Sequence, residues 1–336
     1  MRLRVATFNI ENLDIGPEWP PIEARVPTLQ AQLRRLNADI ICLQEVNGQK
    51  LPGARARQLL ALDAVVKHTG YESFQRASTI NESSGGAYDV HNLVTLSRFP
   101  IRRIEQVLHM LVPPMTHRIL FSPQTPAATD IRWDRPLLHT EIAVSETCRL
   151  HVINLHLRAP IASAVPGGKS SATTWRDTTA WAEGYFLAEM KRSGQALEAR
   201  LLTDQILDKS HDAAILVCGD FNAEANDTAL QILQASPEDT GNRDLAWRTL
   251  VPLENPGDDI RQFTVMHGGR GVMLDHILAS ATMALACRNV TIDNSALLDE
   301  VEPASVSSLR PGSYHAPVVA EFQLQTTSRV DGDPID

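Results

Sequence analysis

The sequence predicts an α/β (α+β) fold in which mixed β-sheets pack on one another and helices cover the outside. Short apolar runs rich in β-branched residues recur from one end of the chain to the other, as expected of buried strands. Strand-like runs outnumber helical patterns, and two of the runs are close enough to form an antiparallel hairpin. A purely parallel, doubly wound sheet would instead need a helix between nearly every pair of strands.

The predicted strands share a length of four to seven residues, and several of them end in a polar or turn-forming cluster. The hairpin is predicted for residues 138–144 and 150–155, which only a short polar segment separates. The full set of predicted strands is residues 3–8, 40–43, 91–96, 138–144, 150–155, 214–218, 273–278 and 317–322.

Apolar residues at three- and four-residue spacing predict helices over residues 26–36, 57–67 and 180–207, the last as two helices or as one with a break near Gly194. Residues 158–174 are rich in Pro, Gly, Ser and Ala, which predicts a long mobile loop. The aromatic residues near the third helix fall at helical spacing and are interpreted as packing residues: Trp175, Trp181, Tyr185 and Phe186.

Composition limits the classes of function. The 336 residues carry a net charge of −9, whereas proteins that grip long nucleic acid through its backbone usually show a basic footprint. This disfavours a tight non-specific nucleic-acid binder without excluding a nuclease, because Arg outnumbers Lys and suits phosphate contacts. Cys42 and Cys218 sit in apolar runs, as buried free thiols do. The N-terminus has a strand pattern and no apolar run reaches the roughly 20 residues of a membrane span, so we expect a cytoplasmic protein.

Polar residues stand where several predicted strands end. Groups on strand ends converge at one rim of an α/β architecture, where loops leave a crevice. Each such residue alone also fits a turn or a solvated surface, so only their combination points to a site. The residues are Asn9, Glu45, Asn154, His156, Asp220, Asn222, Asp275, His276 and His315.

These residue types suit hydrolysis of a phosphate ester. A hard cation takes oxygen ligands, and Glu45 is a natural first ligand, with the Asn9 carbonyl oxygen as a neutral one beside it. Asp220 could orient or deprotonate an attacking water, and Asn222 could hold that water or a phosphoryl oxygen.

Imidazole groups would complete such a site. A His paired with a carboxylate can present a charged donor to phosphoryl oxygens as negative charge builds up in the transition state. Asp275 with His315 is the predicted pair, and His156 is a second donor.

The same motifs, in their order along the chain, resemble the endonuclease/exonuclease/phosphatase superfamily. The resemblance runs from residue 7 to about residue 322 and therefore covers nearly the whole chain. Its most specific pieces are the Gly-Asp-Phe-Asn and Leu-Gln-Glu-Val sequences. The matching motifs are Thr7-Phe8-Asn9, Leu43-Gln44-Glu45-Val46, Asn154-Leu155-His156-Leu157, Gly219-Asp220-Phe221-Asn222, Leu274-Asp275-His276-Ile277 and His315-Ala316-Pro317-Val318.

The resemblance implies a four-layered sandwich of two mixed β-sheets, face to face, with helices outside. It implies one domain over residues 1–325, with residues 158–195 as an inserted loop and helix, and the polar, acidic composition of residues 326–336 predicts a disordered tail after it. It also implies a Mg²⁺- or Mn²⁺-dependent attack of water on phosphorus, with a metal-site pair, a nucleophile-positioning pair, a phosphate donor and a supported catalytic His. Asn9 and Glu45 correspond to the metal-site pair, and Asp220 and Asn222 correspond to the pair that positions the nucleophile. His156 corresponds to the phosphate donor, and His315 corresponds to the catalytic His that Asp275 supports.

One position departs from the family pattern. The family usually has Asp immediately before the terminal His, but this chain has Tyr314 before His315. The change removes a carboxylate that normally helps to bind metal, so we expect a single-metal enzyme in which Tyr314→Asp raises metal affinity.

The predicted function is a metal-dependent phosphoesterase acting on a phosphodiester or phosphomonoester, most readily as a nuclease. The alternatives are a small-molecule or lipid phosphodiesterase or phosphatase, and a catalytically weakened phosphate-binding homologue in which Tyr314 has replaced the usual Asp. A nucleotide-driven enzyme is disfavoured, because the segment 166–170 resembles only the end of a P-loop. We expect a phosphoester substrate, with nucleic acid as one candidate, and a monomer without a membrane span.

Overall fold

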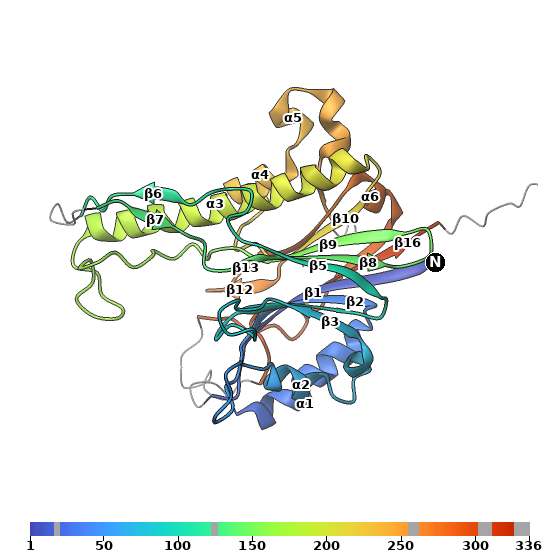
Figure 1. Ribbon diagram of the computed structural model, residues 1–336, viewed down its shortest axis with the longest axis horizontal. Helices are drawn as coiled ribbons and strands as arrows, with labels where there is room; N and C mark the ends of the chain where they lie inside the picture. Colours follow the sequence, from blue (N-terminus) through green and yellow to red (C-terminus); the bar gives the residue numbers. More distant parts are fainter. Residues whose placement is uncertain (17–20, 122–126, 255–261, 302–310, 326–336) are drawn as a thin grey trace, which may run out of the picture.

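Two β-sheets pack face to face between two layers of helices in the computed structural model (Figure 1). The structure describes residues 1–16, 21–121, 127–254, 262–301 and 311–325, so the tail predicted at 326–336 lies outside the described residues. Helices α1 and α2 cover the outer face of one sheet, and α3 and α4 cover the outer face of the other. The predicted four-layered α/β sandwich is confirmed.

Each large sheet is mixed and has six strands. The pairs β1/β2 and β9/β10 are parallel, and the other neighbours within these sheets are antiparallel. In spatial order the first sheet is β15 (Cys287–Ile292), β16 (Val318–Gln323), β1 (Arg2–Leu13), β2 (Ile40–Val46), β4 (Asn92–Ser97) and β3 (Gln75–Ser78). The second is β11 (Val251–Pro252), β14 (Asp275–Ala279), β10 (Ala214–Asp220), β9 (Arg149–His156), β8 (Leu137–Ala143) and β5 (Ile101–Val107).

Two small hairpins and the helices complete the described fold. The hairpins are β6 (Met115–His117) with β7 (Thr129–Ile131), and β12 (Val265–His267) with β13 (Arg270–Val272). The α-helices are α1 (Ile22–Leu36), α2 (Leu60–Val66), α3 (Thr178–Lys209), α4 (Thr228–Gln234), α5 (Pro237–Thr240) and α6 (Ala281–Ala286), and two 3₁₀ turns span η1 (Tyr71–Ser73) and η2 (Arg243–Arg248). No helix among the described residues combines the length and the apolar character needed to cross a lipid bilayer.

The eight predicted strands and the β8–β9 hairpin are confirmed, with ends shifted by a few residues. Helix α3 differs from its prediction because it runs through Gly194 without a break. Gly194 is instead a packing position: a Cβ there would lie 2.6 Å from Trp133, so the missing side chain lets the indole approach the helix. The two small hairpins were not predicted, because their three-residue strands are too short to show an alternating pattern.

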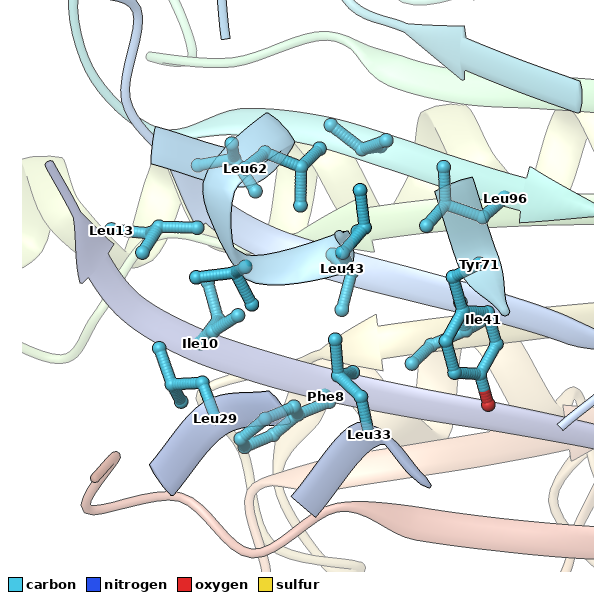
Figure 2. Packing of buried hydrophobic residues seen from close by; sticks show 14 of the residues in the cluster. Phe8, Ile10, Leu13, Leu29, Leu33, Ile41, Leu43, Leu62, Tyr71 and Leu96 are labelled. Carbon is cyan, nitrogen blue, oxygen red and sulfur yellow. The ribbon is translucent and has the colours of Figure 1, made fainter. Parts of the chain in front are cut away.

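Alternating strand residues divide the core into layers. In β1, Phe8 and Ile10 pack on the α1 side against Leu29 and Leu33 (Figure 2), as expected for side chains two residues apart on one face. The faces of the two sheets that are turned toward each other form a second core, which includes Val5 of β1. The strands therefore bury both faces, which explains their continuously apolar sequences.

Candidate active site

The face of each central strand that looks toward the other sheet begins apolar and ends polar. In β10, Leu216 and Cys218 lie in the core between the sheets, and Asp220 follows two residues later on the same face. The same spacing carries β1 from Val5 to Asn9. Period-two geometry thus brings the polar ends of strands from both sheets to one edge of the inter-sheet core.

Strand register aligns the residues of the second sheet. Asp220 lies opposite His156 in the parallel neighbour β9 and opposite Asp275 in the antiparallel neighbour β14. Deeper in the same layer, Gln44 Nε2 donates to Asn154 Oδ1 at 2.8 Å, and this bond ties the two sheets together. Asn154 therefore connects the sheets, and it lies two residues before His156, deeper in the core than the site itself.

The Gly-Asp-Phe-Asn sequence forms a tight turn at the end of β10. A Cβ on Gly219 would lie 1.9 Å from the carbonyl oxygen of Leu155, so only glycine allows β9 and β10 to pair this closely. After the turn, the Asn222 backbone N–H donates to Asp220 Oδ1 at 2.9 Å. Its side-chain Nδ2 donates to the Leu157 carbonyl at 3.1 Å, which orients the amide.

Asn9 joins the carboxylates of the two sheets. Its Nδ2 donates to Asp220 Oδ2 at 2.9 Å and to Glu45 Oε1 at 3.2 Å. Its Oδ1 accepts the Glu11 backbone N–H at 2.9 Å, and this contact fixes which end of the amide is oxygen. Asn9 therefore turns its nitrogen, rather than the metal-binding oxygen predicted from the sequence, toward the carboxylates.

Glu45 is held in a strained backbone position, with φ at +60°. Its Oε2 accepts the Asn12 backbone N–H at 2.9 Å. Burial alone would raise the pKa of Glu45, but the nearby imidazoles of His91 and His315 and the bonds from Asn9 and Asn12 outweigh burial and lower it. The carboxylate is thus kept charged at neutral pH.

His156 faces both acidic groups. Its Nε2 lies 3.4 Å from Asp220 Oδ2 and 3.8 Å from Glu45 Oε1. Burial, together with Arg135, His91 and His315, holds the pKa of His156 well below its usual value. The ring is therefore neutral, and it can donate or accept a hydrogen bond according to its tautomer.

His315 has the opposite charge state. Its Nδ1 lies 2.8 Å from Asp275 Oδ2, and Asp275 is fully buried. Burial lowers the pKa of His315, but Asp275 and then Asp220 and Glu45 outweigh burial and raise it to about 10. The ring is an imidazolium at neutral pH, and the bond to Asp275 leaves Nε2–H as its other donor.

Asp220 has the character of a general base. Burial and the neighbouring Asp275 carboxylate raise its pKa to about 7, against the opposing effects of His315, Asn222 and Asn9. A carboxylate with a pKa near the working pH can accept a proton from water and release it again. His315 and Asp220 thus place a protonated imidazole and a weakly acidic carboxylate in one buried cluster.

The sequence did not single out Glu11, His91 or Arg135 as site residues. The Glu11 carboxylate accepts the Tyr314 backbone N–H at 2.7 Å; burial raises its pKa, and repulsion from nearby Glu45 adds to this effect. Arg135 donates from Nη2 to His91 Nδ1 at 2.7 Å, and His91 Nε2 lies 3.9 Å from Glu45. The spacing Asn9-x-Glu11 at the end of a strand was the available signal for Glu11.

The donor set fits a divalent cation. Two groups of potential ligands converge within 4.8 Å, namely Glu45, His156 and Asp220, and Asp220, Asp275 and His315. Two buried atoms in these groups, His156 Nδ1 and Asp275 Oδ1, lack a hydrogen-bond partner among the described residues. Buried carboxylates without matching donors are costly unless a cation or another bound group neutralises them.

All seven predicted site residues thus lie in one cluster: Asn9, Glu45, His156, Asp220, Asn222, Asp275 and His315. His276, named with its neighbour in the sequence, turns to the other face of β14 and hydrogen-bonds the Ala223 carbonyl at 2.9 Å.

Comparisons with known proteins agree with the family resemblance seen in the sequence. A sequence profile described as the Endonuclease/Exonuclease/phosphatase family matches residues 6–315. No curated protein sequence gives a significant match. Truncated TDP2 of Caenorhabditis elegans is 14% identical, with a TM-score of 0.56 over 96% of this chain and 97% of that chain. The 3′-5′ exonuclease NExo of Neisseria meningitidis is 17% identical, with a TM-score of 0.53 over 96% and 100%. The human Nocturnin catalytic domain is 16% identical, with a TM-score of 0.52 over 96% and 94%.

Proposed function

Because the chain belongs to the endonuclease/exonuclease/phosphatase family and is a phosphoesterase of its metal-dependent, nuclease-like type, we propose that it hydrolyses phosphodiester bonds in nucleic acid with a single Mg²⁺ or Mn²⁺ ion. The observation that carries the proposal is the convergence of carboxylates and imidazoles from both sheets in one buried cluster, with Asp220 shared by two potential metal-binding groups.

The residues divide the reaction between them. Asp220 accepts the proton of the attacking water, and Asn222 orients that water beside it. His315, fixed by Asp275, donates Nε2–H to a phosphoryl oxygen as negative charge develops there. Neutral His156 donates a second hydrogen bond to the phosphoryl group, and Asn9 holds the two sheets' carboxylates in place.

Glu45 is the proposed principal metal ligand, with Glu11 close by. A bound divalent cation would supply positive charge to the phosphoryl oxygens and so stabilise the transition state. Oxygen-rich donors favour Mg²⁺ or Mn²⁺ over softer ions.

A phosphoester panel tests the proposal. We expect turnover of bis-p-nitrophenyl phosphate and of single-stranded DNA, abasic duplex or RNA that depends on Mg²⁺ or Mn²⁺. Glu45→Gln should weaken Mn²⁺ binding in calorimetry by about 10- to 100-fold, because it replaces a charged ligand by a neutral one of the same shape.

The panel also separates the alternatives. Hydrolysis confined to inositol phosphates or sphingomyelin would favour a small-molecule or lipid phosphodiesterase. Metal binding without turnover of any phosphoester would instead identify a phosphate-binding homologue and rule out the catalytic roles given above. Cytoplasmic location, a monomeric state and the single domain over residues 1–325 stay predictions from the sequence.

Glu11 offers a replacement for the carboxylate that the family usually has at position 314. Tyr314 N–H donates to Glu11, so this carboxylate is anchored beside the departure from the family pattern. We expect Glu11→Gln to weaken Mn²⁺ binding about 10-fold, and Tyr314→Asp to restore it in the Glu11→Gln background. Calorimetry of the wild type, both single variants and the double variant measures this. If Glu11→Gln leaves Mn²⁺ affinity unchanged, Glu11 has no place in the metal site.

A further inference from the structure

Helix α3 extends well beyond the sheet that it covers. It has 32 residues and is therefore about 48 Å long. Its N-terminal part projects past the sheets, with β6, β7 and the loop before α3 alongside (Figure 1). We call this projection the arm and define it as residues 107–121, 127–135 and 157–192. It includes residues 158–192 of the segment 158–195 that the sequence predicts as an insertion.

Two buried glutamates of α3 fix the arm in place. Glu198 accepts the His109 and Leu111 backbone N–H groups at 3.1 Å and Trp133 Nε1–H at 2.7 Å. Four helical turns away, Glu183 accepts the Leu120 and Phe121 backbone N–H groups at 2.6 and 2.8 Å. These charge-assisted bonds hold the β6–β7 hairpin against the helix, so the surface of the arm is pre-formed.

That surface exposes aromatic rings around a hollow. Trp181 and Phe186, which the sequence analysis interpreted as packing residues, are 47% and 51% exposed, so that interpretation is wrong for these two. They border a hollow of about 700 Å³ whose other lining residues are His117, Leu120, Thr178, Thr179, Ala182 and Glu183. Exposed aromatic rings beside a hollow contribute little to folding and are typical of a binding surface.

The arm also differs in charge from the rest of the chain. It contains eight Lys and Arg against five Asp and Glu, a net charge of +3, whereas the whole chain carries −9 and the remainder therefore −12. At its root Arg158 and Lys191 share one carboxylate, Asp134, at 3.2 and 2.7 Å, which leaves a local excess of positive charge. Such a patch attracts a polyanion.

The root of the arm touches the catalytic turn. Arg192 Nη1 donates to the Asn222 carbonyl at 3.0 Å. Trp181 precedes Arg192 by eleven residues of one helix, which corresponds to about 16 Å. That distance corresponds to about five steps at the 3.4 Å spacing of a fully stacked strand, and to fewer steps of a more extended one.

We propose that the arm binds an unpaired stretch of nucleic acid, with bases stacked on Trp181 and Phe186 and phosphates led past Arg158 and Lys191 to the catalytic cluster. Stacking on exposed aromatic rings beside cations is how proteins hold single strands without reading sequence. The inference rests on the proposed function and names the form of its substrate. Because most of the exposed surface of the hollow is apolar, a lipid surface is the alternative occupant, and the test below distinguishes the two.

Binding without catalysis tests the inference. Fluorescence anisotropy in EDTA would follow the full chain with fluorescein-labelled dT12, rU12 and dT3. Trp181→Ala and Phe186→Ala should each weaken binding of the 12-mers about 5- to 100-fold, as expected for loss of one stacked base. The trimer can occupy fewer of the arm's contacts at once than a 12-mer, so the wild-type protein should bind it more weakly and the two substitutions should change its affinity less. The matched control is Leu285→Ala, a substitution at an apolar side chain 79% exposed on α6.

The outcomes separate this inference from the proposed function. Wild-type protein that cleaves oligonucleotides, with unchanged 12-mer affinity in Trp181→Ala and Phe186→Ala, overturns the role of the arm alone. Wild-type protein that neither binds nor cleaves oligonucleotides, yet hydrolyses bis-p-nitrophenyl phosphate, overturns the nucleic-acid substrate and the arm together. Loss of binding to anionic vesicles in Trp181→Ala, without loss of 12-mer binding, would assign the arm to a lipid surface instead. Unchanged circular dichroism and melting temperature show that the variants are folded.

Discussion

His315→Gln should lower kcat by about 10³- to 10⁴-fold with little change in KM. Gln retains a hydrogen-bond donor of similar reach, so a loss this large would reflect the missing positive charge rather than a missing contact. The charge matters most when the phosphoryl oxygens become more negative in the transition state, because only interactions that strengthen there raise the rate. Steady-state kinetics on bis-p-nitrophenyl phosphate with saturating Mg²⁺ measure the effect.

Asp275→Asn is the companion variant, and its signature is a changed pH profile. Against the effect of burial, the Asp275 carboxylate, together with Asp220 and Glu45, raises the pKa of His315 to about 10, so wild-type kcat should stay high up to about pH 9. In Asp275→Asn the pKa of His315 should fall, and the alkaline decline of kcat should begin at lower pH. An unchanged alkaline limb in Asp275→Asn, or a His315→Gln variant within 10-fold of wild type, would contradict the role of this pair.

The architecture of the site could be predicted because it follows from strand periodicity. Asn9 and Asp220 each lie an even number of residues beyond core residues of their strands, so the pattern that buries Val5 and Cys218 also orients the polar residues. Fold and site therefore share one signal, and motif order identifies the family from the same residues.

Other features depend on contacts that sequence spacing does not encode. The orientation of the Asn9 amide is set by the backbone N–H of Glu11, and the carboxylate of Glu11 is placed by Tyr314 from the far end of the chain. Trp181 has helical spacing like its buried neighbours, but the small apolar cluster that covers this part of α3 includes Leu187 and not Trp181. Helical periodicity gives the face of a helix and does not show where its covering sheet ends.

The turn that contains Asp220 could be predicted from the sequence, but the proton affinity of Asp220 follows only from the structure. Its position in Gly-Asp-Phe-Asn indicates a turn, whereas the pKa near 7 comes from burial and from Asp275, which is brought opposite by β14. Acid and base roles in the cluster are therefore set by packing between strands that are distant in sequence.

Asp220→Asn should lower kcat by about 10³-fold or more, because an amide cannot accept the proton of the attacking water. The change is nearly isosteric, and the amide oxygen can still accept one of the two hydrogen bonds that Asp220 accepts, from Asn9 Nδ2 or from the Asn222 backbone N–H. Substrate binding in EDTA should therefore change less than 10-fold, which separates a catalytic role from a structural one. A kcat within 10-fold of wild type would show that another group accepts the proton.

Thermal unfolding supplies a second, opposite expectation for the same variant. The folded-state pKa of Asp220, about 7, lies above the value of about 3.9 that an unfolded Asp has, so the folded protein disfavours the charged form. Stability from this group is thus fully present below about pH 4 and is lost as pH rises through about 7. The neutral amide does not titrate. The melting temperature of Asp220→Asn in EDTA, relative to that of the wild type, should therefore rise as the pH is raised from 5 to 8. An Asp220→Asn variant that instead loses stability relative to the wild type over this range would show that the Asp220 charge holds the cluster together, and its low kcat would then reflect a disordered site rather than a missing base.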